Sequence, residues 1–336
     1  MLRKTIQIIS GISFALLFLS CSEKQSNYYT IKGEVHGTYY TITYGAETDC
    51  LVRESLDSVF HAFDASLSTF VPTSIISRVN VNDSTVKLDS LFITVFEKGQ
   101  YVSRETNGAF DMTVAPLVNV WGFGFKKSDS VTPEMIDSLK QYTGYQKVKL
   151  VDGKVLKEHP NIMLDGSAIA KGYSCDIVAR YLRSIGLSNY MIEIGGEIVT
   201  SGVNSKGTLW HIGITRPDEN NSFVQPDIQT VISLSNCGLA TSGNYRQFYY
   251  KDGKRYSHTV NPATGYPVEH NLLSASVVAP DCMTADAFAT AFMVMGLDSA
   301  YAYASTHPEL AALFIYSDDN GQMQVKYTDS FAKYIQ

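Results

Sequence analysis

The chain has 336 residues, of which 45% are hydrophobic and 18% are charged. This is the composition of a globular protein with a substantial core, and it excludes extensive disorder. The formal net charge of −6 gives no positive field for a nucleic-acid backbone, so nucleic-acid binding is excluded as a function.

The amino-terminal segment has the layout of a secretory signal peptide. A basic start precedes an apolar run over residues 6–19, which is too short and too interrupted to favour a membrane span. Ser20 and Cys21 follow the run, and Cys21 is at the position where a lipoprotein signal peptidase would cut and a diacylglycerol group would be attached. We therefore predict lipidation at Cys21, which would anchor the protein to a membrane. The alternative is an ordinary cleaved secretory signal.

This interpretation divides the chain into three parts. We predict a lipoprotein signal peptide over residues 1–20, the lipidated cysteine with a polar tether over 21–29, and one folded domain over 30–336. The protein is then expected in the bacterial cell envelope, where it would be lipid-anchored to a membrane and would face the periplasm or the exterior.

Apolar spacing predicts the elements of the first half of the domain. Alternation of aromatic and β-branched residues over 33–44 indicates a strand. Apolar residues at helical spacing predict helices over 52–67 and 90–106, and the second should end at the Asn-Gly pair 107–108. The Thr-Pro pair at 132–133 should begin a short third helix.

The second half of the domain is richer in strands. A helix is predicted over 169–185, with Gly186 as its stop. The later elements are strands over 190–194, 197–201, 209–215, 228–234 and 273–279, helices over 283–295 and 297–305, and a hairpin of 311–316 with 323–327. Strands and helices do not alternate as βαβ units. The sequence therefore predicts an α+β fold, as a single body in which an antiparallel-rich mixed sheet packs against helices.

Four segments rich in glycine and hydroxyl groups are candidates for ligand binding, over residues 164–173, 241–245, 258–265 and 284–290. In the first, small residues lead into a helix start with Lys171, which suits an anion, although an ordinary capped helix has the same pattern. The third contains His258, a candidate proton acceptor, but a lone histidine is more often structural.

The fourth segment offers oxygen ligands. Asp286 and Thr290 are four residues apart, so they share one face of a helix among alanines, and this suits a hard cation such as Mg²⁺. The alternative is that Asp286 only complements the helix dipole while Thr290 bonds back to a carbonyl.

Together these segments resemble one family. Residues 164–176 are similar to the L-D-x-x-A-I-A-K-G-Y-x-x-D signature of the ApbE family of FAD:protein FMN transferases. The other matches are 195–197 with its G-G-[DE] turn, 241–245 with T-S-G-x-Y, 258–265 with H-x-x-[DN]-P-x-T-G, and 285–290 with A-D-x-x-[AS]-T. Because five motifs occur in the family's order, the resemblance covers the chain from about Gly33 to Met295.

The resemblance implies a reaction and its ligands. Members of the family bind FAD and Mg²⁺ and transfer the FMN moiety to a threonine or serine hydroxyl of a partner protein, with release of AMP. The implied metal ligands are the backbone carbonyl of Ala168, the carboxylate of Asp286 and the hydroxyl of Thr290, completed by diphosphate oxygens. The implied FAD contacts are Phe70, Ala109, Phe110, Asp111, Asp165, Lys171 and Val260.

The resemblance leaves the proton acceptor and the balance of activities open. His258 or a carboxylate near the metal, Asp286 among them, is the candidate catalytic base for the attacking hydroxyl. Two alternative functions use the same ligands: a Mg²⁺-dependent FAD pyrophosphatase that yields FMN and AMP, and a lipoprotein that binds FAD without chemistry.

Three positions depart from the family pattern. His36 stands where many relatives have a methionine that touches flavin, Gly166-Ser167 replaces a commoner Leu-Gly, and Phe70 lacks the hydroxyl of a tyrosine. These changes bear on flavin affinity rather than on the metal ligands. The family's acceptor pattern D-x-x-[ST]-G-A-[ST] is absent, so self-flavinylation is not expected. The expected acceptors resemble electron-transfer subunits of the sodium-pumping quinone reductase and Rnf complexes.

Overall fold

The computed structural model describes residues 27–51, 53–123, 131–217, 227–245, 248–251 and 254–336. The predicted signal peptide and lipidation site at Cys21 lie outside these residues. The tether was predicted to reach residue 29, but residues 27–29 already belong to the sheet, where they pair with residues 44–46. Among the described residues, no helix is long and apolar enough to cross a membrane.

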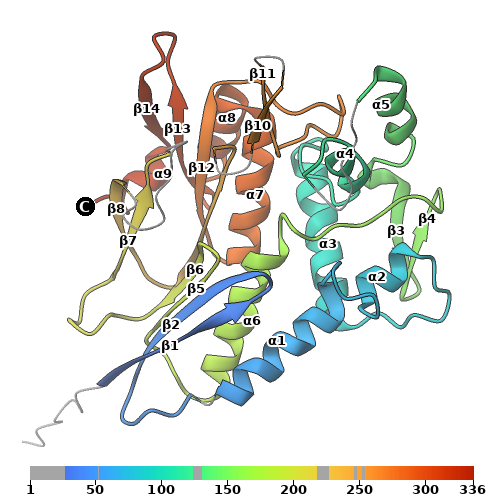
Figure 1. Ribbon diagram of the computed structural model, residues 1–336. Helices are drawn as coiled ribbons and strands as arrows, with labels where there is room; N and C mark the ends of the chain where they lie inside the picture. The colour runs from blue at the N-terminus through green and yellow to red at the C-terminus, as the bar shows by residue number, and fades with distance from the viewer. Residues whose placement is uncertain (1–26, 52, 124–130, 218–226, 246–247, 252–253) are drawn as a thin grey trace, which may run out of the picture.

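A central sheet of eight strands organises the molecule, in the order β1-β2-β5-β6-β9-β12-β13-β14 (Figure 1). These strands are β1 (Asn27–Val35), β2 (Thr38–Ala46), β5 (Tyr190–Ile194), β6 (Glu197–Ser201), β9 (Cys237–Gly243), β12 (Leu272–Ala279), β13 (Ala311–Ser317) and β14 (Met323–Tyr327). The α+β fold is confirmed. The sheet was expected to be antiparallel-rich and mixed, and its described pairings are all antiparallel.

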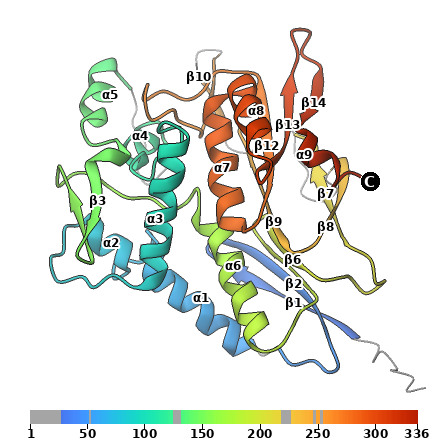
Figure 2. The same ribbon diagram turned by 180° about the vertical axis from the view of Figure 1, so that it is seen from behind.

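Both faces of the sheet are covered, as Figures 1 and 2 show. One face carries α6 (Ala170–Ser184), α7 (Cys282–Met295) and α8 (Leu297–Thr306), with α1 (Arg53–Leu67) and α3 (Ser90–Glu105) packed against them. The other carries the hairpin β7 (Trp210–Thr215) and β8 (Ile228–Leu234), together with α9 (Asp329–Ala332). Neighbouring residues of one strand serve opposite faces: Val199 packs toward α6, and Ile198 packs toward Trp210.

A helical lobe extends beyond α3. It contains α2 (Ile75–Asn80), α4 (Ala115–Val120), α5 (Pro133–Lys140), a 3₁₀ turn (Tyr145–Lys147) and the hairpin of β3 (Val148–Val151) with β4 (Lys154–Lys157). The hairpin β10 (Phe248–Lys251) and β11 (Lys254–Ser257) meets this lobe where Trp121 stacks on Tyr256 at 5.4 Å. The lobe therefore stands beside α7, and α3 links the two.

Helix α7 is the most enclosed helix on this face of the sheet. Apart from Thr284, Asp286 and Thr290 its residues are apolar, and a helix of that composition is expected in a core. Twelve of its fourteen residues are buried, and only Thr290 and Met295 are partly exposed. Asp286 is therefore a carboxylate held inside a helix that otherwise buries apolar or small side chains, and burying such a charge is costly unless it has partners.

The predicted helices agree with the structure to within one or two residues, but one predicted strand is wrong in detail. The stretch 33–44 is two strands, because His36 and Gly37 have φ of 52° and 72° and form the two-residue turn of the β1–β2 hairpin. Strand β9 was not predicted, because its small residues lack the apolar alternation that marks a strand.

Candidate functional site

The loop that leads into α6 is held by its backbone. Asn80 uses its amide group twice on Leu164, donating to the carbonyl at 2.9 Å and accepting from the amide at 2.7 Å. The next amide, of Asp165, donates to the carbonyl of Met112 at 2.7 Å. The Asp165 carboxylate accepts from the amide of Ser167 at 2.8 Å and so closes a turn. These bonds fix the start of the predicted phosphate-binding loop.

The cap of α6 comes from another helix. Ile169 occupies the N-cap position and makes no side-chain cap. The carboxylate of Asp286, on α7, instead accepts a hydrogen bond of 2.9 Å from the amide of Gly172. In a regular helix that amide would bond the carbonyl of Ala168. Because Asp286 takes the amide, the Ala168 carbonyl receives no hydrogen bond from the described residues and is available to a ligand.

Glycine is required at position 172 because α6 and α7 nearly touch there. A Cβ at this position would lie 2.3 Å from the carbonyl oxygen of Cys282 and 2.8 Å from the Cβ of Asp286. We expect Gly172→Ala to lower the free energy of unfolding by about 3 kcal/mol, at the upper end for overpacking, because backbone atoms must move. Thermal unfolding measures this loss.

The matched control is Gly166→Ala in the same loop. A Cβ at Gly166 would meet only the Cβ of Ala170, at the ordinary contact distance of 3.6 Å. We expect its stability to stay within about 0.5 kcal/mol of the parent protein. Equal destabilisation of the two variants would contradict the close approach of the helices.

Thr290 continues the polar face of α7. It lies one helical turn after Asp286, and its hydroxyl is 3.1 Å from that of Ser242, on β9. The candidate ligand-binding segment 241–245 therefore contacts the face of α7 that was predicted to bind a metal. Asp286 and Thr290 come from α7 and Ala168 from the loop before α6, so two sequence-distant motifs join at one place.

A buried ion pair lies beside this face. Lys171 donates to the carboxylate of Glu197, which follows the Gly195-Gly196 turn between β5 and β6. The Glu197 side chain is 5% exposed, while the Lys171 side chain is 37% exposed. Burial raises the pKa of Glu197 to about 7 against the opposing Lys171 ammonium. For Lys171, burial acts to lower the pKa, but Glu197 and Asp286 together raise it, so the lysine stays protonated.

When both carboxylates are ionised, the three groups beside this face carry a surplus of negative charge. One ammonium, on Lys171, faces two carboxylates, on Glu197 and Asp286. Burial also raises the pKa of Asp286, although Lys171 and the amide of Gly172 act in the opposite direction. A cation beside Asp286 would remove this penalty, because it would compensate the buried negative charge.

The donor set suits a hard cation. Ala168, Asp286 and Thr290 would supply a carbonyl, a carboxylate and a hydroxyl, which are all oxygen donors as Mg²⁺ prefers. No group of three or more His, Cys, Asp or Glu side chains that could hold a metal occurs among the described residues. Substrate oxygens could complete the coordination of a cation here, because Mg²⁺ is usually bound by one or two carboxylates together with phosphates.

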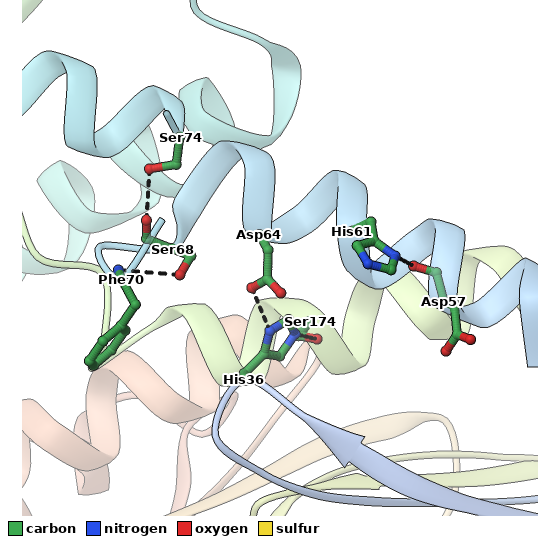
Figure 3. Close-up of polar contacts among 8 residues, drawn as sticks. All are labelled: His36, Asp57, His61, Asp64, Ser68, Phe70, Ser74 and Ser174. Atoms are coloured by element: carbon green, nitrogen blue, oxygen red, sulfur yellow. Dashed lines mark hydrogen bonds and ion pairs between the residues drawn. The ribbon is translucent and has the colours of Figure 1, made fainter. Parts of the chain in front are cut away.

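Phe70 is an exposed aromatic residue. It lies in the turn between α1 and α2 (Figure 3), and the residue is 80% exposed. The turn is ordered by Ser68, whose carbonyl accepts from the hydroxyl of Ser74 at 2.7 Å and whose hydroxyl accepts from the amide of Phe70 at 3.3 Å. A large, mostly exposed ring on an ordered turn is of a kind that stacks against planar ligands.

At the predicted FAD contacts Ala109 to Asp111, the side chains of Phe110 and Asp111 are engaged within the protein. Phe110 is 1% exposed and belongs to the core. The carboxylate of Asp111 accepts from the amide and hydroxyl of Thr113, both at 2.7 Å, and from the amide of Tyr145 at 2.8 Å. A ligand at this turn would therefore contact its backbone.

His258 and Val260 lie on the side of the helical lobe. Val260 packs with Leu117 and Trp121 in a small apolar cluster. The ring of His258 meets that of Phe123 edge-on, with centroids 6.3 Å apart. The structure thus brings Ala168, Lys171, Asp286 and Thr290 together, whereas His258 is placed by contacts with the lobe.

Sequence reasoning missed the partners that hold the site together. Glu197, Gly172 and Ser242 all lie inside recognised motifs, but none was assigned a role. For Glu197 the sequence did hold a signal: it is the acidic residue of the recognised Gly-Gly-Glu motif, and a lysine in a neighbouring motif needs an acidic partner when it is partly buried. For Ser242 and Gly172 the contact is across helices and strands, which a single sequence does not show.

The fold and the site define a class of protein. It is an α+β protein in which oxygen donors that suit a hard cation lie beside a protonated lysine, an arrangement that suits the binding of a diphosphate. Comparison with known proteins narrows the class. The ApbE family model matches residues 36–314. The chain belongs to the ApbE family.

Individual relatives match over nearly the whole chain. FAD:protein FMN transferase of Haemophilus influenzae is 34% identical over 99% of this chain and 98% of its own length. Among solved structures, flavin transferase ApbE from Vibrio cholerae has a TM-score of 0.82 and 34% identity, over 92% of this chain and 99% of that one. The apo form of Pseudomonas stutzeri flavinyl transferase ApbE has a TM-score of 0.82 and 30% identity, over 92% and 97%.

Proposed function

We propose that this protein is an FAD:protein FMN transferase that uses Mg²⁺ to move the FMN moiety of FAD onto a threonine or serine hydroxyl of another protein. The observation that carries the proposal is the meeting of the Ala168 carbonyl, Asp286 and Thr290 beside Lys171, in a chain whose full-length relatives carry that activity by name. Mg²⁺ bound there would offset charge on the diphosphate.

The residues have distinct tasks in this reaction. Lys171 binds the diphosphate as a fixed positive charge, and Glu197 holds its side chain in place. Phe70 and the backbone of the Ala109 to Asp111 turn bind the flavin end, with Asp165 and Val260 as further contacts. The acceptor hydroxyl forms a bond to the FMN phosphorus, the phosphorus–oxygen bond to AMP breaks, and the hydroxyl proton goes to His258 or to a carboxylate beside the metal.

The test is direct. The purified protein, incubated with FAD, Mg²⁺ and an acceptor domain, is expected to give a fluorescent flavin adduct that survives a denaturing gel, with one AMP released per adduct. Chelation with EDTA should abolish both products, because the all-oxygen donor set depends on a divalent cation.

Other outcomes would select another function. AMP release at equal rates with and without acceptor would favour an FAD pyrophosphatase. FAD that stays intact for days with Mg²⁺ and several acceptors would favour a binding protein without chemistry.

We also propose where the protein acts. The signal-like segment and Cys21 support a lipid-anchored protein of the cell envelope, on the periplasmic or exterior side. Its acceptors would then be extracytoplasmic electron-transfer subunits like those of sodium-pumping quinone reductase or Rnf complexes. Metabolic labelling with a fatty acid tests the anchor: Cys21→Ser should lose the label.

A further inference from the structure

His36 forms the tip of the β1–β2 hairpin. Its φ of 52° and that of Gly37 at 72° make a tight turn with the side chain of His36 directed between α1 and α6 (Figure 3). The ring is only 10% exposed and lies against Phe63 at 4.8 Å and Phe60 at 5.7 Å between centroids. The residue is therefore turned into the protein.

Both ring nitrogens of His36 have partners. Nδ1 is 2.8 Å from the carboxylate of Asp64 on α1, and Nε2 is 3.0 Å from the hydroxyl of Ser174 on α6 (Figure 3). A carboxylate only accepts, so the proton sits on Nδ1, and in the neutral ring Nε2 accepts from Ser174. Burial lowers the pKa of His36, although Asp64 opposes this, so the neutral form prevails near pH 7.

This Ser–His–Asp arrangement is not built for nucleophilic catalysis. Ser174 is only 1% exposed, so its hydroxyl is buried away from any substrate. The order of donors runs from Ser174 to His36 and from His36 to Asp64, across three separate elements. Such a chain of hydrogen bonds fixes the relative position of β1–β2, α1 and α6.

The position that it fixes is next to Lys171. Ser174 lies three residues after Lys171 in α6, and Thr38 follows directly after the turn. A Cβ on Gly195 would lie 2.9 Å from the Thr38 side chain and 3.5 Å from the stem of Lys171. Thr38, Gly195 and Lys171 therefore pack together, and a shift of the turn would move the wall against which the Lys171 stem rests.

We propose that His36 is a positioning residue for FAD binding: by joining Asp64 to Ser174 it locks the β1–β2 turn onto the first turns of α6 and keeps Lys171 aligned for the diphosphate. This inference rests on the proposed function. It assigns the departure from the family pattern at this position to a hydrogen-bonded anchor in this chain.

The test variant is His36→Asn. Asparagine tolerates the left-handed backbone of residue 36 but cannot span both Asp64 and Ser174. Because a misplaced Lys171 weakens ground-state and transition-state binding alike, KM for FAD should rise about tenfold while kcat changes less than about twofold. The dissociation constant of FAD, read from flavin fluorescence without acceptor, should rise by the same factor.

The matched control is His61→Asn. His61 lies on the same helix α1, but its ring bonds the carbonyl of Asp57 within its own helix, at 2.7 Å (Figure 3). This variant should keep the KM and the dissociation constant of the parent protein. An unchanged KM in His36→Asn would overturn the proposal, and so would an equal effect in His61→Asn.

A double-mutant cycle separates positioning from loss of fold. Ser174→Ala removes the other end of the anchor, so the double variant His36→Asn/Ser174→Ala should bind FAD no more weakly than the weaker single variant. Additive losses would contradict a shared anchor. The fluorescence titration also needs no turnover, so a parent protein that binds FAD but forms no adduct would fail the proposed function while still testing His36.

Discussion

Asp286→Asn is expected to lower the rate of FMN transfer by about a thousandfold or more, because a metal-bound carboxylate supplies several kcal/mol to the transition state. Asparagine can still accept the hydrogen bond from the amide of Gly172, so the contact between α6 and α7 is kept. The rate of adduct formation at increasing Mg²⁺ measures the effect, and the half-saturating Mg²⁺ concentration should rise.

The same variant should not lose stability. Burial raises the pKa of Asp286 in the folded protein, so the folded state favours its protonated form. Above the pKa of the unfolded chain the ionised carboxylate therefore costs stability, and this cost is present at neutral pH. In EDTA, the Tm of Asp286→Asn should equal or exceed that of the parent protein.

Asp281→Ser provides the control for a carboxylate lost from the same helix. Asp281 caps α7 by accepting from the amide of Thr284 at 2.7 Å, and serine can replace it in that role. Its transfer rate should stay within about twofold of the parent, since it touches none of the proposed ligands. Transfer that survives in Asp286→Asn would show that the metal site has been assigned to the wrong residue.

Lys171→Met is expected to reduce both activity and stability. The loss of a charge on the diphosphate should lower kcat/KM for FAD by about 10²- to 10³-fold. Glu197 would be left buried without its partner, and the loss of one partner from a buried ion pair typically lowers the free energy of unfolding by about 3–5 kcal/mol. Because the Lys171 side chain is 37% exposed and the pair is screened by solvent, we expect a loss of about 2 kcal/mol.

The stability loss in Lys171→Met should depend on pH. Without the ammonium, the pKa of Glu197 should rise beyond its value of about 7, because Lys171 is the group that lowers it. The folded state then binds more protons than the unfolded state, so stability falls as pH rises from the unfolded pKa through the folded one. Unfolding in urea with EDTA should show a larger deficit at pH 8 than at pH 5.

The double variant Lys171→Met/Glu197→Gln distinguishes the two effects. Removal of the stranded carboxylate should recover most of the stability, whereas the transfer rate should stay low because no charge faces the diphosphate. Recovery of transfer in the double variant would mean that Lys171 acts only through Glu197.

The local signals in the sequence were sufficient for most helices. The Asn-Gly pair 107–108 has positive φ at both residues and ends α3 as predicted, and Thr132 caps α5 by accepting from the amide of Met135 at 3.3 Å. Such caps are local in the chain, so a sequence shows them directly. The hairpin turn at His36 was missed because a His-Gly pair is a weaker sequence signal for a two-residue turn than Asn-Gly or Asp-Gly.

The candidate site shows the same division. The motifs around Lys171 and Asp286 were recognisable in sequence because their chemistry depends on residue type and on short spacings. What those motifs touch was not recognisable: Asp286 caps α6 from another helix, and Lys171 pairs with Glu197 from a β-hairpin. Contacts between segments separated by 26 and 114 residues depend on how the sheet orders its strands.

The sequence by itself therefore determined the family, the fold class and the identity of the proposed ligand residues, since each follows from local patterns. Only the tertiary structure decided that no described residue donates to the Ala168 carbonyl, that Lys171 faces two buried carboxylates, and that His36 points inward to Asp64 and Ser174. The physical reason is that hydrogen-bond partners and burial are properties of neighbours in space, which the order of residues along one chain does not specify.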